Sequence, residues 1–211
     1  MNEDVFTKPP PYGRITDWLG PEMLQRLLDF AQKQRDSFFQ TTVGYTEENR
    51  RVDLNVRRSS RIIALGSLKE ELQTNLRAIL PAMFQRLGAE PFEPSKFEVE
   101  MVAHGDGALF TEHRDTAIES EDSIEGKKFV AQRVISAVYY FHRLPKSFTG
   151  GILRIYPLIG RDKSNAFVEI EPANDRLVFF PSWFPHEVLP VVCPSGRFED
   201  SRFAGNFWIY R

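Results

Sequence analysis

The second half of the chain is a series of short apolar runs separated by Gly, Pro, Asn and Asp, and this feature most constrains the fold. Runs of this length are typical of strands, and many of them at close spacing are typical of an antiparallel sandwich or barrel. We therefore expect a β barrel in this half. The predicted strands are 97–103, 133–142, 151–156, 166–170, 176–180, 188–192 and 203–210.

Two helices are predicted before this barrel. In the first, over about 21–35, apolar residues recur at helical spacing. The second begins with a capping box formed by Ser67 and Glu70, bends at Pro81 and ends at Gly88. Both helices are expected to pack against the barrel and to buttress it.

These elements predict an α+β fold in a single domain over 1–211. Helical support is expected over about 15–90 and the barrel over about 97–210. A chain of 211 residues is long enough to fill one hydrophobic core. The charged insert at 119–128 interrupts the strands and is expected to be a mobile loop beside the functional site.

Composition and charge narrow the classes of function. The formal net charge of −2 provides no basic field for nucleic acid or for an anionic membrane. Cys193 is the only cysteine, so an internal disulfide and a thiolate zinc cluster are excluded, and any metal must be held by nitrogen and oxygen. No run approaches the roughly 20 apolar residues of a membrane span, so the expected location is cytoplasmic.

Histidines are few, which limits how a metal site could be built. His113 and Asp115 are two residues apart, a spacing that puts both side chains on one face of an extended backbone. This pair alone is weak evidence, because many short surface loops contain one. A third ligand is needed. The histidines of the chain are His104, His113, His142 and His186.

His186 supplies a third ligand of the right type. It follows an apolar run and a turn that contains two prolines, and by itself it would be interpreted as a partly buried core residue. With His113 and Asp115 it makes a set of two imidazoles and one carboxylate. Such a set leaves three positions open on one side, as in non-haem Fe(II) oxygenases, whereas structural zinc closes its shell.

Arg202 opens the last predicted strand, and its face of that strand is shared by Ala204, Asn206 and Trp208. An unpaired arginine is too costly to bury, so this side chain either points to solvent or binds an anion. The planar guanidinium matches a carboxylate at two points.

Several segments, in order, resemble the prolyl-hydroxylase branch of the Fe(II)/2-oxoglutarate-dependent dioxygenases, which includes the oxygen-sensing hydroxylases and their bacterial relatives. The resemblance covers over half the chain and implies a double-stranded β-helix (jelly-roll, cupin-like) barrel. The matching segments are 101–103, 113–115, 138–140, 150–157, 171–180, 185–190 and 202–204. The Fe(II) ligands that it implies are His113, Asp115 and His186.

The resemblance also implies how 2-oxoglutarate binds. Arg202 would bind its distal carboxylate with Tyr140 as a helper, and Trp208 would line the pocket near the metal. In the family this basic residue usually lies closer to the last histidine, so Arg197 is a rival. We prefer Arg202 because a strand follows it, whereas Arg197 lies in a segment that is typical of a loop.

Two other histidines have open or minor roles. His104 stands where relatives often carry a tyrosine that helps to hold the co-substrate. It is either a donor in that role or a strand-end residue, and it is also the next candidate for a metal ligand. His142 lies past the paired tyrosines of its run and is expected to be structural.

The implied reaction uses O₂ and 2-oxoglutarate to hydroxylate an unactivated carbon and yields succinate and CO₂, with ascorbate as a plausible reductant. The implied substrate is a prolyl residue of a protein or peptide, and the alternative is a free amino acid or secondary metabolite. Segments 40–61 and 116–130 are the expected substrate-facing loops. Two alternatives from other classes are a zinc hydrolase, which would give Arg202 and Tyr140 no role, and a metal-binding barrel without catalysis.

Overall fold

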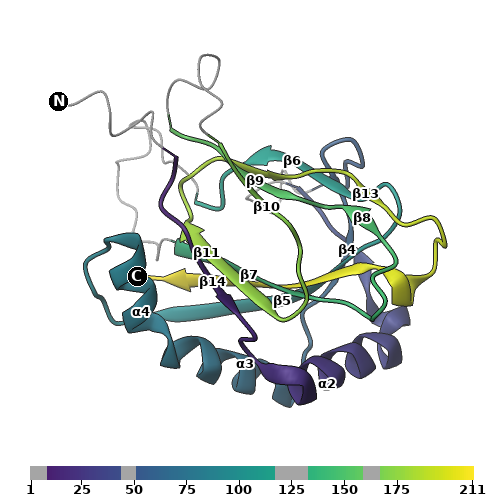
Figure 1. Ribbon diagram of the computed structural model, residues 1–211, viewed down its shortest axis with the longest axis horizontal. Coiled ribbons are helices and arrows are strands. Elements are labelled where there is room, and N and C mark those ends of the chain that lie inside the picture. Colours follow the sequence, from purple (N-terminus) through teal and green to yellow (C-terminus); the bar gives the residue numbers. More distant parts are fainter. Residues whose placement is uncertain (1–8, 44–50, 117–132, 159–166) are drawn as a thin grey trace.

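The structure is a computed structural model and describes residues 9–43, 51–116, 133–158 and 167–211. Helices cover one face of a large sheet, and a smaller sheet lies over its other face (Figure 1). Every strand pairing among the described residues is antiparallel. The arrangement is a jelly-roll-like α+β fold, which confirms the predicted fold class.

The larger sheet has the strand order β1-β11-β7-β14-β5-β4-β2. Its three long central strands pair along almost their whole length, and these are β5 (Lys96–His104), β7 (Arg133–Phe141) and β14 (Arg202–Tyr210). The flanking strands are β1 (Gly13–Thr16), β2 (Phe39–Gln40), β4 (Ser60–Ile62) and β11 (Arg176–Pro181).

The smaller sheet has the strand order β10-β9-β12-β6-β3, and a separate two-stranded sheet joins β13 to β8. Its strands are short. They are β3 (Arg57–Arg58), β6 (Leu109–His113), β9 (Leu153–Ile155), β10 (Val168–Ile170) and β12 (His186–Val188). The two-stranded sheet consists of β8 (Thr149–Gly150) and β13 (Val191–Val192).

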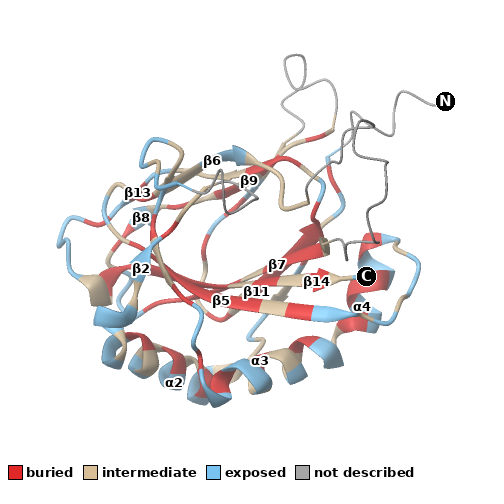
Figure 2. Ribbon diagram, turned by 180° about the vertical axis from the view of Figure 1, so that it is seen from behind, coloured by how far each residue is buried: buried red, intermediate tan, exposed pale blue. Residues whose placement is uncertain are grey.

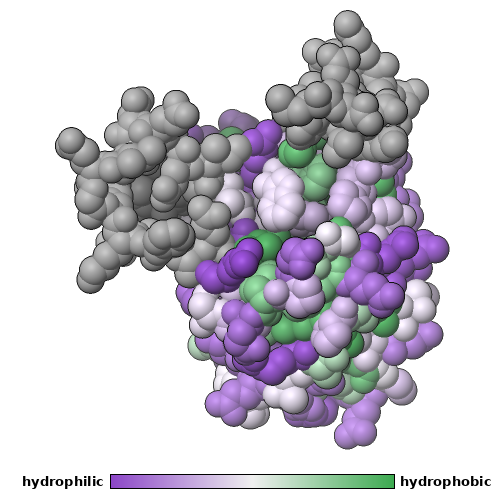
Figure 3. All heavy atoms as spheres, turned by 90° about the vertical axis from the view of Figure 1, so that its left-hand side faces the viewer, coloured by the Kyte–Doolittle hydropathy of each residue, from purple (hydrophilic) through white to green (hydrophobic). Residues whose placement is uncertain are grey.

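The helices present apolar residues at helical spacing to the larger sheet, and their buried residues lie on the sides that face this sheet (Figure 2). They are α2 (Gly20–Lys33), α3 (Ser67–Ala78) and α4 (Leu80–Leu87), with short 3-10 turns η1 (Arg35–Ser37) and η3 (Phe198–Asp200). At the end of the molecule that carries α4, hydrophobic residues gather between hydrophilic ones (Figure 3). None of the helices in the described ranges combines the length and the apolar character needed to cross a membrane.

Alternation along the central strands divides the interior into two regions. Phe203 and Phe207 of β14 pack in the core between sheet and helices, together with residues such as Leu27 and Leu76. Ala204, on the opposite face of the same strand, packs in a second cluster between the two sheets. Arg202, Asn206 and Trp208 are each separated from Ala204 by an even number of positions, so their side chains lie on the same face as Ala204. The polar side chains of β14 therefore point into the space between the two sheets.

The second predicted helix begins at Ser67 as expected, but its N-terminal cap and its middle differ from expectation. The capping box at Ser67 is wrong, because Gly66 is the N-cap, with a φ of 58°, and no side chain caps the helix. Instead of bending at Pro81, the helix breaks at Ile79 into α3 and α4, since a proline in the first turn of α4 needs no intrahelical N–H partner. The predicted end at Gly88 is confirmed by its left-handed conformation.

The predicted strands are found with shifted bounds, and several short strands were not predicted. The predicted strand at 188–192 is divided between β12, which begins at His186, and β13. Pro190, which has no N–H to donate to a ladder, stands between them. The strands that were not predicted are β1, β2, β3, β4, β6 and β8. The insert at 119–128 lies outside the described residues. A single domain over 1–211 stays a prediction.

A carboxylate from far along the chain holds the start of α2. The N-cap residue Leu19 makes no side-chain cap of its own. The Asp175 carboxylate instead accepts the backbone N–H groups of Leu19 and Gly20, each at 2.9 Å. The hydroxyl of Tyr139 also donates to Asp175 at 2.9 Å, so one buried carboxylate ties the helix start to β7 of the larger sheet.

We expect Asp175→Asn to lower the free energy of unfolding by about 1–3 kcal/mol, because an amide has one acceptor oxygen where the carboxylate has two. Asparagine tolerates the left-handed backbone found at this position, so the loss would report the hydrogen bonds. Urea denaturation measures the difference. Asp29→Asn, at an exposed carboxylate that accepts from Gln25, is the control and should cost less than about 0.5 kcal/mol. Equal losses in the two variants would contradict the tether.

Candidate metal centre

Two histidines and one aspartate meet between the sheets. One potential ligand atom from each of His113, Asp115 and His186 lies within 4.8 Å of the other two. His113 ends β6 and His186 begins β12, and the antiparallel register places these residues opposite each other. Asp115 follows β6 by two residues. The predicted trio is therefore brought together by the pairing of two short strands.

Backbone carbonyls orient both imidazoles. The Nδ1 of His113 lies 2.8 Å from the carbonyl oxygen of Thr111, and the Nδ1 of His186 lies 2.9 Å from that of Phe184. A carbonyl only accepts hydrogen bonds, so each Nδ1 carries the proton and each Nε2 keeps its lone pair. The Nε2 atoms face Asp115 at 3.8 and 3.5 Å, ready to act as metal ligands.

Asp115 is fixed by hydroxyl groups from the larger sheet. The Ser136 hydroxyl on β7 donates to Oδ2 of Asp115 at 2.6 Å, and it lies 2.8 Å from the hydroxyl of Ser182. The backbone N–H of Asp115 donates to the carbonyl oxygen of Ser182 at 3.1 Å. A hydrogen bond from the Trp208 side chain also favours the ionised carboxylate. The sequence analysis did not single out either serine.

Protonation states at the site suit metal binding. Burial and the neighbouring His186 lower the pKa of His113 to about 3, so its imidazole is neutral at neutral pH. Burial opposes the charge on Asp115, but the two histidines and the hydrogen bond from Ser136 lower the pKa of Asp115 overall. Neutral imidazoles and an ionised carboxylate are the forms that bind a metal.

Aromatic rings enclose the histidines. The ring of Phe110 stacks on His113 with centroids 3.4 Å apart, and Phe180 meets His186 edge to face at 4.8 Å. These apolar contacts limit the positions that each imidazole can occupy, and they line the histidine side of the site with groups that do not bind water.

Arg202, at the start of β14 in the larger sheet, is buried, with 1% of its surface exposed. Its Nε donates to the carbonyl oxygen of Gly151 at 2.9 Å, and its Nη1 lies 3.1 Å from Nδ1 of His104. Among the described residues no carboxylate pairs with it. Burial lowers the pKa of Arg202, which measures how unfavourable this charge is without an anion.

Tyr140 and His104 complete the surroundings of this guanidinium. The carbon at its centre lies 4.8 Å from the centroid of the Tyr140 ring. The Tyr140 hydroxyl is buried and has no hydrogen-bond partner of ordinary geometry in the part of the chain that the structure describes, although it is close enough to Arg202 for that charge to act on it. Burial and the charge of Arg202 lower the pKa of His104 far below its usual value, so this ring is neutral and its Nδ1 accepts from Arg202.

Gly151 has a role in this site that the sequence analysis did not predict. Its φ is +67°, and a Cβ at this position would lie 2.5 Å from Cδ of Arg202. Only glycine lets the backbone approach the arginine closely enough to accept its Nε hydrogen. The two consecutive glycines before a short strand could have indicated a close backbone approach. That the approaching residue is Arg202 could not be predicted, because it depends on how the strands pair.

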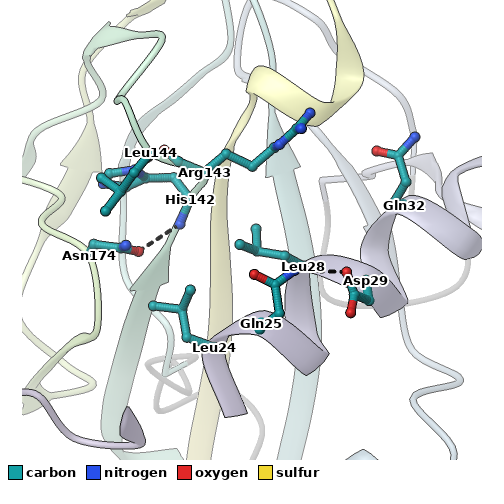
Figure 4. A pocket seen from close by; sticks show the side chains of 9 residues that line it. All are labelled: Leu24, Gln25, Leu28, Asp29, Gln32, His142, Arg143, Leu144 and Asn174. Atoms are coloured by element: carbon teal, nitrogen blue, oxygen red, sulfur yellow. Dashed lines mark hydrogen bonds between the residues drawn. The ribbon is translucent and has the colours of Figure 1, made fainter. Parts of the chain in front are cut away.

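The other residues named from the sequence lie in different places. Arg197 is bound to Asp200 at 2.8 Å, and 63% of its side chain is exposed. His142 is buried beside Asn174 and lines a separate pocket against α2 (Figure 4). That pocket shares no residue with the metal centre. Trp208 lies under Arg133, whose guanidinium carbon is 4.3 Å from the Trp208 ring.

The comparisons with known proteins agree with this geometry. Residues 99–210 match the family model of the 2OG-Fe(II) oxygenase superfamily. The chain belongs to this family. An uncharacterized PKHD-type hydroxylase of Synechocystis is 34% identical over 213 residues, a match that covers 99% of this chain and 66% of the relative. The chain therefore spans just under two thirds of that relative's length.

Two solved structures share the fold. A prolyl-4-hydroxylase of Pseudomonas putida has a TM-score of 0.66 and 20% identity, with 96% of this chain and 94% of that chain covered. A prolyl hydroxylase of Trichoplax adhaerens, in complex with a peptide fragment of the hypoxia inducible factor oxygen degradation domain, has a TM-score of 0.66 and 21% identity. That match covers 95% of this chain and 84% of the other.

The residues present fit the groups that the family binds, which are Fe(II) and 2-oxoglutarate. Two imidazole nitrogens and a carboxylate oxygen form a donor set suited to Fe(II). A buried guanidinium without a carboxylate, next to a buried hydroxyl without a partner, suits a dicarboxylate. The ligand trio comes from the smaller sheet and the guanidinium and hydroxyl come from the larger one, and both groups lie in the interior between the sheets.

We expect Ser136→Ala to weaken Fe(II) binding about 10- to 100-fold, because Asp115 would lose the hydroxyl group that orients it. Anaerobic Fe(II) titration against a competing chelator measures the change. The control is Ser147→Ala, because the Ser147 hydroxyl donates to the Pro145 carbonyl oxygen at an exposed site. This variant should bind Fe(II) with unchanged affinity. Unchanged affinity in Ser136→Ala would show that the hydroxyl does not orient the ligand.

Proposed function

We propose that the chain is an Fe(II)- and 2-oxoglutarate-dependent dioxygenase that hydroxylates an unactivated carbon, namely that of a prolyl residue in a protein or peptide. The observation that carries this proposal is the buried guanidinium of Arg202, which shares an interior with the trio of metal-ligand candidates and has no carboxylate partner among the described residues. A metal centre alone would fit many reactions, but a metal centre together with a buried guanidinium that no described carboxylate pairs fits this co-substrate.

His113, Asp115 and His186 would hold the iron and leave three positions open for co-substrate and O₂. When bound, Fe(II) and 2-oxoglutarate supply the oxidation of the substrate, which is coupled to decarboxylation of 2-oxoglutarate to succinate and CO₂. The chain itself supplies position. Ser136 and the two backbone carbonyls fix the direction of each ligand before the metal arrives.

Arg202 would bind the distal carboxylate of 2-oxoglutarate, and the free hydroxyl of Tyr140 would donate a second hydrogen bond to it. His104 is a positioning residue in this proposal. Its neutral Nδ1 and the Gly151 carbonyl take two of the five guanidinium hydrogens and so turn the remaining ones toward the anion. Trp208 would line the pocket near the metal.

Two classes that the sequence left open receive less support. A zinc hydrolase or a non-catalytic metal-binding barrel would use the same three ligands but would leave Arg202 buried without a function. Membership of the oxygenase superfamily argues in the same direction.

A prolyl substrate is supported by the name of the Synechocystis relative, a PKHD-type hydroxylase, and by the peptide bound to the Trichoplax structure. A free amino acid or secondary metabolite is the second candidate substrate. The use of ascorbate and a cytoplasmic location stay predictions.

Replacing any of the three ligands by alanine is expected to lower iron occupancy and to abolish formation of succinate from 2-oxoglutarate. Metal analysis and a succinate assay without added substrate measure the two effects. His142→Ala is the control, because His142 lies in a different pocket, and it should retain both properties. Equal iron content in all four variants would overturn the ligand assignment.

Loss of Arg202 should lower the affinity for 2-oxoglutarate and leave the iron content unchanged. Removing a charge-assisted contact to a buried carboxylate costs on the order of 2–5 kcal/mol, which is a tens- to thousands-fold loss of affinity. We expect this for Arg202→Ala, partial recovery in Arg202→Lys, and little change in Arg197→Ala, since Arg197 is bound to Asp200 outside the pocket. Anaerobic titration of 2-oxoglutarate, followed by the metal-to-ligand charge-transfer band, decides between them. A large effect of Arg197→Ala alone would identify Arg197 as the clamp.

A further inference from the structure

A second group of charges lies between the sheets and has no part in the roles assigned so far. Glu100 on β5 is 3% exposed and accepts from Arg57 at 3.2 Å and from Arg61 at 2.7 Å. Asn206 on β14 donates to the same carboxylate at 3.2 Å. Arg57 comes from β3 of the smaller sheet and Arg61 from β4 of the larger one, so this cluster, the Glu100 cluster, joins the two sheets.

The Glu100 cluster adjoins the metal centre. The guanidinium carbon of Arg57 lies 4.6 Å from the centroid of the Phe110 ring, and that ring is stacked on His113. Register explains the contact, since Arg57 and Phe110 are partners in the pairing of β3 with β6. The negative charge of Asp115 is also close enough to favour the charged form of Arg57. Only one aromatic ring separates Arg57 from a metal-ligand candidate.

The Glu100 cluster carries an unbalanced positive charge. Two guanidinium groups meet a single carboxylate, and within the described residues neither pairs with another. Their side chains are only 12% and 21% exposed. Burial lowers the pKa of Arg57, although Glu100 opposes this, so the surplus charge is held at a cost. An anion bound here would remove that cost.

Unused hydrogen-bond donors point to the same conclusion. The Nε atoms of Arg57 and Arg61 are buried and have no hydrogen-bond partner among the described residues. Buried donors of this kind are rare unless a ligand or water meets them. On its outer side Arg61 stacks over Phe39, which is 46% exposed, with its guanidinium carbon 5.3 Å from the ring centroid. The cluster thus extends from the metal centre to the surface.

The two carboxylates of 2-oxoglutarate do not account for this surplus. In the function proposed above, one of them meets Arg202 and the other meets the metal beside Asp115. A third anionic group is needed for Arg57 and Arg61, and the molecule to be hydroxylated is the remaining occupant of the pocket. Guanidinium groups suit a carboxylate, which accepts two hydrogen bonds from one fork.

We propose that Arg57 and Arg61, held by Glu100, form a subsite for a carboxylate group of the substrate, close to the carbon that is hydroxylated. This inference rests on the proposed function and names its substrate class, which is a molecule with a carboxylate near the reacting carbon. That carboxylate is supplied either by a small prolyl acid or by an acidic residue beside a proline in a peptide.

Matched acid and amide probes test the subsite. One pair is N-acetyl-L-proline with N-acetyl-L-prolinamide, and the other is the blocked tripeptide Ala-Pro-Asp with Ala-Pro-Asn. Calorimetry on the anaerobic Fe(II) and 2-oxoglutarate complex measures binding without turnover. In at least one pair we expect the acid to bind roughly tenfold or more tightly than the amide, as a charge-assisted hydrogen bond implies. The pair that shows the preference identifies the source of the carboxylate.

Substitutions then locate the preference. Arg57→Gln and Arg61→Gln should each reduce the ratio of acid to amide affinity to near one and leave 2-oxoglutarate binding unchanged. Arg61 is the more exposed of the two, so its variant tests the subsite if loss of Arg57 disturbs folding. The control is Arg77→Gln. Arg77 also pairs with a glutamate, Glu93, and lies over a phenylalanine ring, but it is on α3, away from the metal centre.

Three results would overturn the subsite: no acid preference in either pair, a preference that survives in both variants, or an Arg57→Gln variant that loses affinity for 2-oxoglutarate itself. The last result would assign Arg57 to the co-substrate. Failure of the proposed function can be distinguished from failure of the subsite. It would appear in the unsubstituted protein, which would show no charge-transfer band and form no succinate.

Discussion

Burial of one face of the larger sheet under the helices is the constraint on which the rest of the structure depends. Because side chains alternate along a strand, fixing Phe203 and Phe207 of β14 in the core against α2 and α3 sends Arg202, Asn206 and Trp208 to the other face. A shift of one residue in register would exchange the two sets. Packing of the apolar residues against the helices therefore determines that the polar residues face the smaller sheet, although the two sets of side chains lie on opposite faces.

The charges that result are stabilised in different ways. Asp115 is surrounded by groups that favour its ionised form, and Glu98 on the same face is paired with Arg133, with the hydrogen bonds of Tyr210 and Arg133 outweighing burial to bring its pKa to about 2. Arg202 has only neutral partners. Charges with a partner, such as Glu98, link strands of the larger sheet. A buried charge without a counterion, such as Arg202, indicates a binding site for a ligand of opposite charge.

Sequence patterns predicted local features well and distant partnerships poorly. Short apolar runs predicted the long strands β5, β7 and β14, and the spacing of His113 and Asp115 predicted a shared face. Both predictions succeeded from local patterns because each feature depends on residues that are close in the chain. The second helix begins at Ser67 as predicted, but its capping box was wrong, because the N-cap is Gly66 and the backbone conformation of this glycine is not visible in the sequence.

Partners from other strands were not predictable from local patterns. Ser136 meets Asp115 and Gly151 meets Arg202 only after the strands have paired, and nothing near Ser136 in the sequence distinguishes it from an ordinary strand residue. The basic run around Arg57 and Arg61 was visible, but Glu100 lies some 40 positions later, so its role depends on the closing of the barrel.

The cap of α2 has a consequence for the order of folding. Asp175 is 155 residues from Gly20, whose N–H it accepts, so α2 stays without its N-terminal partner until the chain has been synthesised as far as Asp175. An isolated helix of 14 residues is marginal in water. Contacts of such long sequence separation slow folding. The start of α2 is therefore among the last of the described parts to become stable, although it is synthesised long before the carboxylate that caps it.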